Sequence, residues 1–194
     1  MIHKGKRLFI TGIPTSGKSY LARKLAKKFG GIAVLLDDFR EDLAKDEKYK
    51  NFVNFYFNKD ELEYYAKASP ENQWNDFINQ SKGLWPAFLD KINEYKDETK
   101  PVFFECVNLL PFIVKNNFDI TTVVLVGKSY EETLKRNMEE PRWGKNKELQ
   151  EIEAKSFFYN ERPRYEAEAE KYNCPVFESA DEAFDKICSM IDFK

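Results

Sequence analysis

The chain has 194 residues, of which 42% are hydrophobic and 15% aromatic, and this suits a single domain, residues 1–194, with one core. A formal net charge of −2 argues against a basic nucleic-acid-binding protein. No 18-residue apolar window occurs, so we expect a cytoplasmic protein without a membrane span. One histidine and three cysteines without metal-ligand spacing exclude a zinc site and a histidine-based triad.

The first predicted strand, Arg7–Thr11, leads directly into a loop that matches the Walker A pattern G-x-x-x-x-G-K-[ST] in full. From Lys18 onward, apolar residues recur at three- and four-residue steps, which predicts a helix that ends at Gly30-Gly31. Backbone amides of such a loop, with the positive end of the helix dipole, can surround a polyphosphate. The predicted nucleoside triphosphate site comprises Gly12, Ile13, Pro14, Thr15, Ser16, Gly17, Lys18, Ser19 and Tyr20.

Two side chains of this loop have separate expected roles. The Lys18 ammonium group should reach the β- and γ-phosphates, which makes Lys18 a candidate catalytic residue. The Ser19 hydroxyl offers the oxygen ligand that Mg²⁺ prefers. We therefore expect ATP and Mg²⁺ as the cofactors.

Four further apolar runs predict strands, and predicted helices lie between most of them. Because the runs are continuous rather than alternating, both faces of the sheet should be covered, as in parallel sheets. This pattern indicates an α/β fold with a five-stranded, mainly parallel sheet flanked by helices. The expected strands are Ile32–Leu36, Pro101–Val107, Thr121–Val126 and Pro175–Phe177, and the expected later helices are Ser129–Glu139, Leu149–Tyr172 and one that Ser179 opens.

The segment from about residue 39 to 100 breaks this alternation, because it is rich in aromatic residues and contains no strand-like run. We interpret it as a helical insertion between the second and third strands. Ser69 and Pro70 should begin a helix there, and Pro86 should break or kink it. Aromatic residues at helical spacing indicate core packing, and the alternative is that one or two rings stack on a planar ligand.

With this loop and this order of elements, the chain resembles the P-loop kinases of small molecules and nucleotides, such as adenylate, uridine and shikimate kinases. The resemblance implies the three-layer P-loop NTPase fold and an ATP-dependent phosphotransferase. Its γ-phosphoryl acceptor would be a hydroxyl or phosphate group of a small molecule or nucleotide, bound by the insertion. A nucleotide-binding regulatory protein or weak ATPase without an acceptor shares the same loop and stays an alternative.

The resemblance also implies acceptor-facing residues after the second strand. Asp37 and Asp38 match the carboxylate position that accepts or orients the proton of an attacking hydroxyl, with Asp38 slightly favoured; otherwise they cap the next helix. Arg40 would bind an acidic acceptor or be a surface arginine. At the end of the third strand, Glu105 would hold Mg²⁺, or contact the acceptor while Asp37 takes the metal role. Asn108 is a weaker acceptor-binding candidate.

A lid over the phosphates is implied at about residues 139–148, with Gly144 as part of a hinge. Arg136 and Arg142 would stabilise charge on the transferred phosphoryl group; the alternative is a surface turn. Arg162 and Arg164 are further candidates for this role. The adenine pocket of related kinases would correspond to about residues 178–180.

Overall fold

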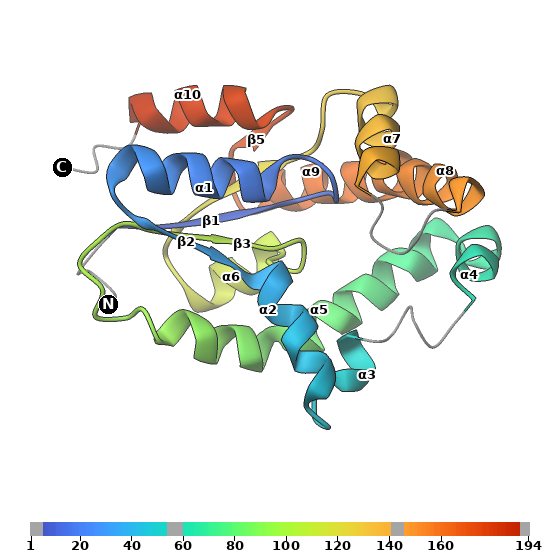
Figure 1. Ribbon diagram of the computed structural model, residues 1–194, viewed down its shortest axis with the longest axis horizontal. Coiled ribbons are helices and arrows are strands. Elements are labelled where there is room, and N and C mark those ends of the chain that lie inside the picture. The colour runs from blue at the N-terminus through green and yellow to red at the C-terminus, as the bar shows by residue number, and fades with distance from the viewer. Residues whose placement is uncertain (1–5, 54–59, 141–145, 191–194) are drawn as a thin grey trace.

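The computed structural model describes residues 6–53, 60–140 and 146–190 (Figure 1). Its sheet contains five strands in the order β2-β3-β1-β4-β5, and every recorded pairing is parallel. This confirms the predicted α/β fold. The strands are β1 (Arg7–Gly12), β2 (Ile32–Leu35), β3 (Val102–Glu105), β4 (Thr121–Leu125) and β5 (Val176–Phe177).

Helices cover both faces of the sheet, which explains why the strands are apolar throughout. Leu8 and Ile10 of β1 pack on one face with α1 (Lys18–Phe29) and α10 (Ala180–Met190). Phe9, which points to the opposite face, packs with α5, α6 and α9. Their bounds are Pro70–Asn93 for α5, Pro111–Asn117 for α6 and Arg162–Lys171 for α9.

The segment between β2 and β3 is helical in all its regular described elements, as predicted, and it begins earlier than expected. Helix α2 starts at Leu36, so both aspartates of the sequence LLDDFR lie in its first turn. Ser69 caps α5 by accepting a hydrogen bond from the Asn72 amide at 3.2 Å. The other elements here are α2 (Leu36–Asp42), a 3₁₀ turn (Leu43–Lys45), α3 (Lys50–Val53) and α4 (Glu61–Lys67).

Helix α5 runs through Pro86, so of the expected break or kink at this residue the break is wrong. Leu84 and Phe88, on either side of the proline, are fully buried in the main core. Their burial offsets the hydrogen bond that Pro86 removes from the helix. Trp74 and Phe77 are also core residues and pack on Tyr165 of α9, as the core interpretation of the aromatic residues predicted.

The C-terminal half supplies the helices that follow β4. Helix α7 (Tyr130–Glu139) matches the expected helix, and Ser129 caps it by accepting from the Glu132 amide. The expected long helix consists of α8 (Lys147–Lys155), a π-helical turn (Ser156–Glu161) and α9. The π turn comes directly before Pro163, whose ring and missing amide disfavour ordinary α-helical bonding there. No helix among the described residues is long and apolar enough to cross a bilayer.

Candidate functional site

The loop between β1 and α1 has the backbone of an anion-binding turn. Positive φ angles occur at Gly12 (130°), Thr15 (62°) and Gly17 (93°), of which only Thr15 is not glycine. The Ile13 amide donates to the Leu125 carbonyl at 3.1 Å, which ties the loop to β4. The Ile13 carbonyl in turn accepts from Ser16 Oγ and Lys18 Nζ, both at 2.8 Å. Such a turn at a helix N-terminus forms the concavity that binds phosphate groups.

Gly12 cannot be replaced without moving the backbone of β4. A Cβ atom at Gly12 would lie 1.9 Å from the Leu125 carbonyl oxygen, and its φ of 130° disfavours any side chain. We expect Gly12→Ala to lower the free energy of unfolding by at least about 3 kcal/mol, measured by chemical denaturation. The matched control is Gly30→Ala, where no atom lies within 4 Å of the new Cβ. Equal losses in the two variants would contradict this steric account.

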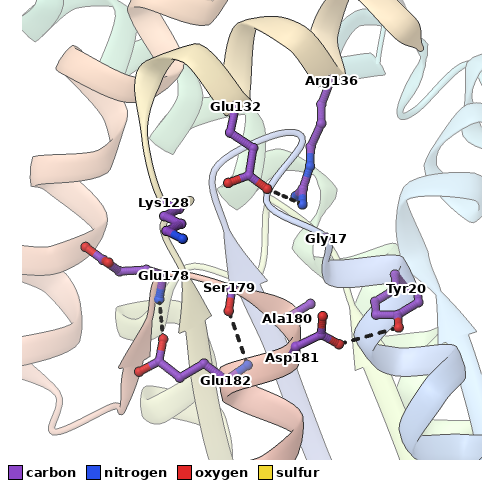
Figure 2. A pocket seen from close by; sticks show the side chains of 10 residues that line it. All are labelled: Gly17, Tyr20, Lys128, Glu132, Arg136, Glu178, Ser179, Ala180, Asp181 and Glu182. Atoms are coloured by element: carbon purple, nitrogen blue, oxygen red, sulfur yellow. Dashed lines mark hydrogen bonds and ion pairs between the residues drawn. The ribbon is translucent and has the colours of Figure 1, made fainter.

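Two cationic side chains lie at the loop. Lys18 is buried, with 4% of its surface exposed. Arg136 reaches the loop from α7, where its NH1 atom donates to the Thr15 carbonyl at 3.0 Å and its NH2 atom pairs with Glu132 (Figure 2). The structure therefore places Arg136 beside the loop, as predicted. Arg142 and Gly144 lie outside the described residues, so the lid stays a prediction.

Glu105 ends β3 next to the loop, with only 1% of its surface exposed. Within the described residues neither of its carboxyl oxygens has a hydrogen-bond partner. Burial, and then the charge of Asp37, raises the pKa of Glu105 to about 7, while Lys18 and the Ser19 hydroxyl act in the opposite direction. Such an unpartnered buried carboxyl group fits a role in binding a cation.

The donor set beside Glu105 suits Mg²⁺. The Ser19 hydroxyl and the Glu105 carboxylate are both oxygen ligands, and Mg²⁺ usually takes few protein ligands and completes its shell with phosphate oxygens and water. Among the described residues no group of three or more His, Cys, Asp or Glu side chains could hold a metal ion.

Asp37 and Asp38 differ in environment, although both lie in the first turn of α2. The Asp37 side chain is 13% exposed, and its Oδ1 atom accepts from the Cys106 thiol at 3.2 Å and lies 3.4 Å from Arg40 NH1. Asp38, one residue on, is exposed. Of the two candidates, Asp37 is thus the one whose orientation is fixed by neighbouring side chains.

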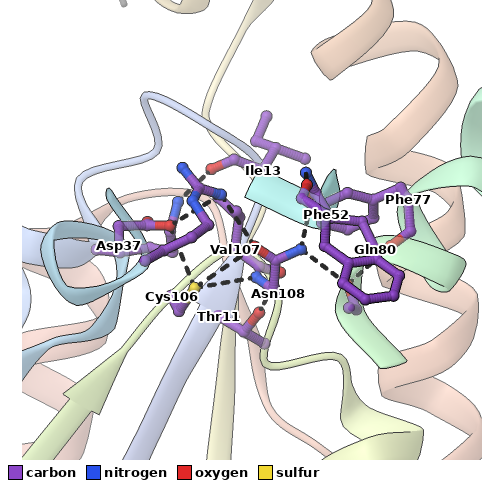
Figure 3. Close-up of polar contacts among 12 residues, drawn as sticks. Thr11, Ile13, Asp37, Phe52, Phe77, Gln80, Cys106, Val107 and Asn108 are labelled. Carbon is purple, nitrogen blue, oxygen red and sulfur yellow. Dashed lines mark hydrogen bonds and ion pairs between the residues drawn. The ribbon is translucent and has the colours of Figure 1, made fainter. Parts of the chain in front are cut away.

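Arg40 and Asn108 are both buried, so the surface-arginine alternative for Arg40 is wrong. Arg40 NH1 donates to Asn108 Oδ1 at 2.9 Å, across 68 residues of sequence. Figure 3 shows Asn108 among Asp37, Cys106 and Gln80, at the junction of the sheet and the insertion. Neither Arg40 nor Asn108 lines the two cavities described next.

A cavity of about 560 Å³ brings five of the predicted loop residues, from Thr15 to Tyr20, together with the two aspartates. It extends from the loop to the C-terminal end of α7. Arg23 belongs to it and was not predicted, since it is one of several charged residues on its helix, whereas Glu139 and Glu140 lie at the start of the predicted lid segment. Its lining residues are Thr15, Gly17, Lys18, Ser19, Tyr20, Arg23, Asp37, Asp38, Arg136, Glu139 and Glu140.

A second cavity, of about 620 Å³, shares Gly17, Tyr20 and Arg136 with the first (Figure 2). The predicted base-binding segment, residues 178–180, lines it. Lys128 also lines this cavity and was missed, although its place just after β4, at the carboxyl edge of the sheet, is a signal for ligand contact. The remaining lining residues are Glu132, Asp181 and Glu182.

Arg162 and Arg164 line neither cavity. Arg162 donates to the Gly127 carbonyl at 2.9 Å and pairs with Glu166 at 2.9 Å and Glu178 at 3.0 Å. It therefore connects α9 to the end of β4 and to a residue of the second cavity. Arg164 pairs with Glu71 of α5. Both guanidinium groups thus have structural partners on the body of the molecule.

No protein-family model matches the chain, and no curated protein matches it significantly. Among solved structures, the chain is similar to an uncharacterized protein from Eubacterium ventriosum, at 17% identity and a TM-score of 0.48, over 98% of this chain and 100% of that one. It is also similar to deoxyadenosine kinase from M. mycoides with bound dATP, at 15% identity and a TM-score of 0.47, over 94% and 97%. To a structure of that kinase with the products dCMP and dCDP, the identity is 15% and the TM-score is 0.46, over 95% of this chain and 100% of that one. These values are too low to place the chain in a family, and the site itself has to indicate the chemistry.

Proposed function

We propose that this protein transfers the γ-phosphoryl group of ATP to an oxygen of a small acceptor. The observation that carries the proposal is the first cavity, which is lined both by the phosphate-binding loop with Lys18 and Arg136 and by the carboxylates of Asp37 and Asp38. A protein that only bound a nucleotide would need the loop. It would not need carboxylates facing the same space, where an attacking hydroxyl group could sit.

The chemistry assigns a role to each group. The acceptor oxygen forms a bond to the γ-phosphorus, the bond between that phosphorus and the β–γ bridging oxygen breaks, and ADP leaves. The Asp37 carboxylate orients the acceptor hydroxyl and takes its proton. Lys18 and Arg136 stabilise the negative charge on the phosphoryl oxygens. Bound Mg²⁺, held by Ser19 and Glu105, would add positive charge at the β- and γ-phosphates.

The second cavity completes the proposal for ATP. The two cavities share three lining residues, which are Gly17, Tyr20 and Arg136. We assign the nucleoside of ATP to this second cavity, with the segment 178–180 and Lys128 beside it. The acceptor then occupies the first cavity together with the γ-phosphoryl group, which leaves the two substrates meeting at the loop.

The test is an acceptor screen with purified protein, Mg²⁺ and ATP or GTP. Nucleosides, nucleoside monophosphates, sugars and amino alcohols are supplied one at a time, ADP is followed by a coupled assay, and mass spectrometry detects the phosphorylated product. We expect one acceptor class to raise the rate of ADP formation strongly and to gain one phosphoryl group. Slow hydrolysis that no acceptor changes would instead support the weak ATPase or regulatory alternative.

Arg136 provides a prediction about the chemical step. Because its guanidinium group sits at the loop and lines both cavities, Arg136→Gln should lower kcat by about 10- to 100-fold and change the affinity for ATP less. Steady-state rates and calorimetry with an ATP analogue measure the two effects. The control is Lys135→Gln, since Lys135 is the adjacent residue of α7, is exposed and pairs with Glu139. An unchanged kcat in Arg136→Gln would remove Arg136 from the mechanism.

A further inference from the structure

Behind Asp37 lies a network of buried polar side chains that lines neither cavity (Figure 3). It joins the start of α2, the loop after β3 and the middle of α5. Every member is at least nine-tenths buried, and the residues around it belong to the main apolar core. The network contacts Asp37, and its members are Arg40, Gln80, Ser81, Cys106 and Asn108.

The hydrogen bonds give the Asn108 side chain one orientation. Its Oδ1 atom faces Arg40 NH1 at 2.9 Å, and arginine can only donate. Its Nδ2 atom donates to Ser81 Oγ at 2.9 Å and to Gln80 Oε1 at 3.1 Å. Gln80 is fixed in turn, because its Nε2 atom donates to the Phe52 carbonyl at 2.8 Å. Asn108 therefore connects the insertion to Arg40 in a defined direction.

Arg40 links Asn108 to Asp37. The guanidinium nitrogen that Asn108 binds, NH1, is also the one that lies 3.4 Å from Asp37 Oδ1. The same carboxyl oxygen accepts from the Cys106 thiol at 3.2 Å. Two donors thus converge on one oxygen of Asp37.

A buried charged network of this kind is poor evidence for stability alone. Removing charged groups from water costs free energy that their mutual attraction often fails to recover, so apolar packing would serve a core at least as well. The network lies directly behind Asp37, a carboxylate of the first cavity that Cys106 and Arg40 contact. Its position is what a positioning role requires, because catalytic carboxylates need fixed geometry.

We propose that Asn108 and Arg40 are positioning residues that set the orientation of the Asp37 carboxylate, with Ser81 and Gln80 of α5 as their support. This inference rests on the proposed function, since it assumes that Asp37 faces the acceptor. It changes the expected role of Arg40 and Asn108 from acceptor binding to control of Asp37. It also makes the insertion part of the catalytic apparatus through α5.

The experiment compares two buried serines of similar environment. Ser81→Ala removes the hydroxyl that accepts from Asn108, whereas Ser156→Ala removes a buried hydroxyl that donates to Gln73 Oε1 at 2.7 Å, outside the network. We expect Ser81→Ala to lower kcat by about 3- to 10-fold and leave the KM for ATP unchanged, with no such effect in Ser156→Ala. Asn108→Asp, which keeps the shape and offers Arg40 a competing carboxylate, should lower kcat by about 10- to 100-fold.

A double-mutant cycle separates positioning from a general structural effect. In an Asp37→Asn background, Ser81→Ala and Asn108→Asp should cause little further loss of kcat, because they act through Asp37. Losses that simply multiply in the two backgrounds would overturn the inference and leave the proposed function intact. Crystal structures of both variants provide a readout without turnover, in which the Asp37 side chain should rotate or lose its contact with Arg40. If no acceptor is phosphorylated by the wild-type protein, the proposed function fails, and an unchanged Asp37 in these structures would then overturn the inference separately.

Discussion

Replacing Lys18 with methionine is expected to reduce phosphoryl transfer by at least about 100-fold while the protein stays folded. The Lys18 ammonium group is buried at the loop and donates to the Ile13 carbonyl, so it lies where the β- and γ-phosphates would bind. Methionine keeps the length and apolar stem of the side chain and removes the charge together with the hydrogen bond to the Ile13 carbonyl. Product formation is measured with the acceptor that the screen identifies, and folding by circular dichroism and thermal melting.

The matched control for this variant is Lys27→Met, in the last turn of the same helix, where the lysine is exposed. It should leave the rate unchanged. The charge of Lys18 also lowers the pKa of Glu105, so its removal should raise that pKa above about 7. A Lys18→Met protein with near-normal turnover would show that the loop does not hold a triphosphate in the proposed manner.

The loop could be predicted from sequence because its requirements are local. Gly12, Gly17, Lys18 and Ser19 act within one turn of chain, and the strand before them and the helix after them were also evident from nearby residues. The position of Glu105 followed similarly from the end of an apolar strand. In both cases the physical reason for the residue lies within a few positions of it.

The environment of Asp37 depended on information that the sequence does not carry locally. Because α2 begins at Leu36, Asp37 and Arg40 are three residues apart on one helical face, and Asp38 is turned about 100° away. Because the helical insertion was expected only from about residue 39, this relation was not evident from the sequence. The partner that buries Arg40, Asn108, is 68 residues distant, and nothing near either residue indicates their contact.

At Pro86, too, distant contacts that the local sequence does not show decide the structure. The local rule that proline ends a helix is sound for an exposed helix, where the lost hydrogen bond and the steric clash decide the outcome. Here the residues on both sides of Pro86 are packed against the sheet, and tertiary burial outweighs the local preference. The expected break did not occur, because a long-range contact competed with a local rule.

Glu105→Gln should remove Mg²⁺-dependent turnover and at the same time make the ligand-free protein more stable at alkaline pH than the wild type. The pKa of Glu105 is about 7 in the folded protein, against 4.5 for an ordinary glutamate side chain. The folded state therefore binds this proton more tightly than the unfolded state. Stability from this group is therefore greatest below pH 4.5 and declines as pH rises toward 7. At about 1.4 kcal/mol per pH unit, the decline is about 3 kcal/mol. Glutamine carries no charge at any of these pH values.

The measurement is the melting temperature of both proteins at pH 5 and pH 8, with and without Mg²⁺ and ATP. Without ligand, the melting temperature of Glu105→Gln relative to that of the wild type should be several degrees higher at pH 8 than at pH 5. With Mg²⁺ and ATP, the wild type should gain stability and the variant should gain much less, because it lacks the carboxylate ligand. The control is Glu61→Gln. Burial and the charge of Glu153 also raise the pKa of Glu61 to about 7, but Glu61 lies on α4 and not at the end of β3 beside Lys18 and Ser19.

Glu61→Gln should thus show a pH-dependent change in stability and keep both turnover and the response to Mg²⁺ and ATP. The comparison isolates the metal role, since the two glutamates share a raised pKa and differ in place. If Glu105→Gln keeps its dependence on Mg²⁺ and instead raises the KM for the acceptor, Glu105 contacts the acceptor and Asp37 becomes the candidate metal ligand. In that case Arg40, by holding Asp37, would orient a ligand of the cation rather than a base, and the positioning network would serve the metal.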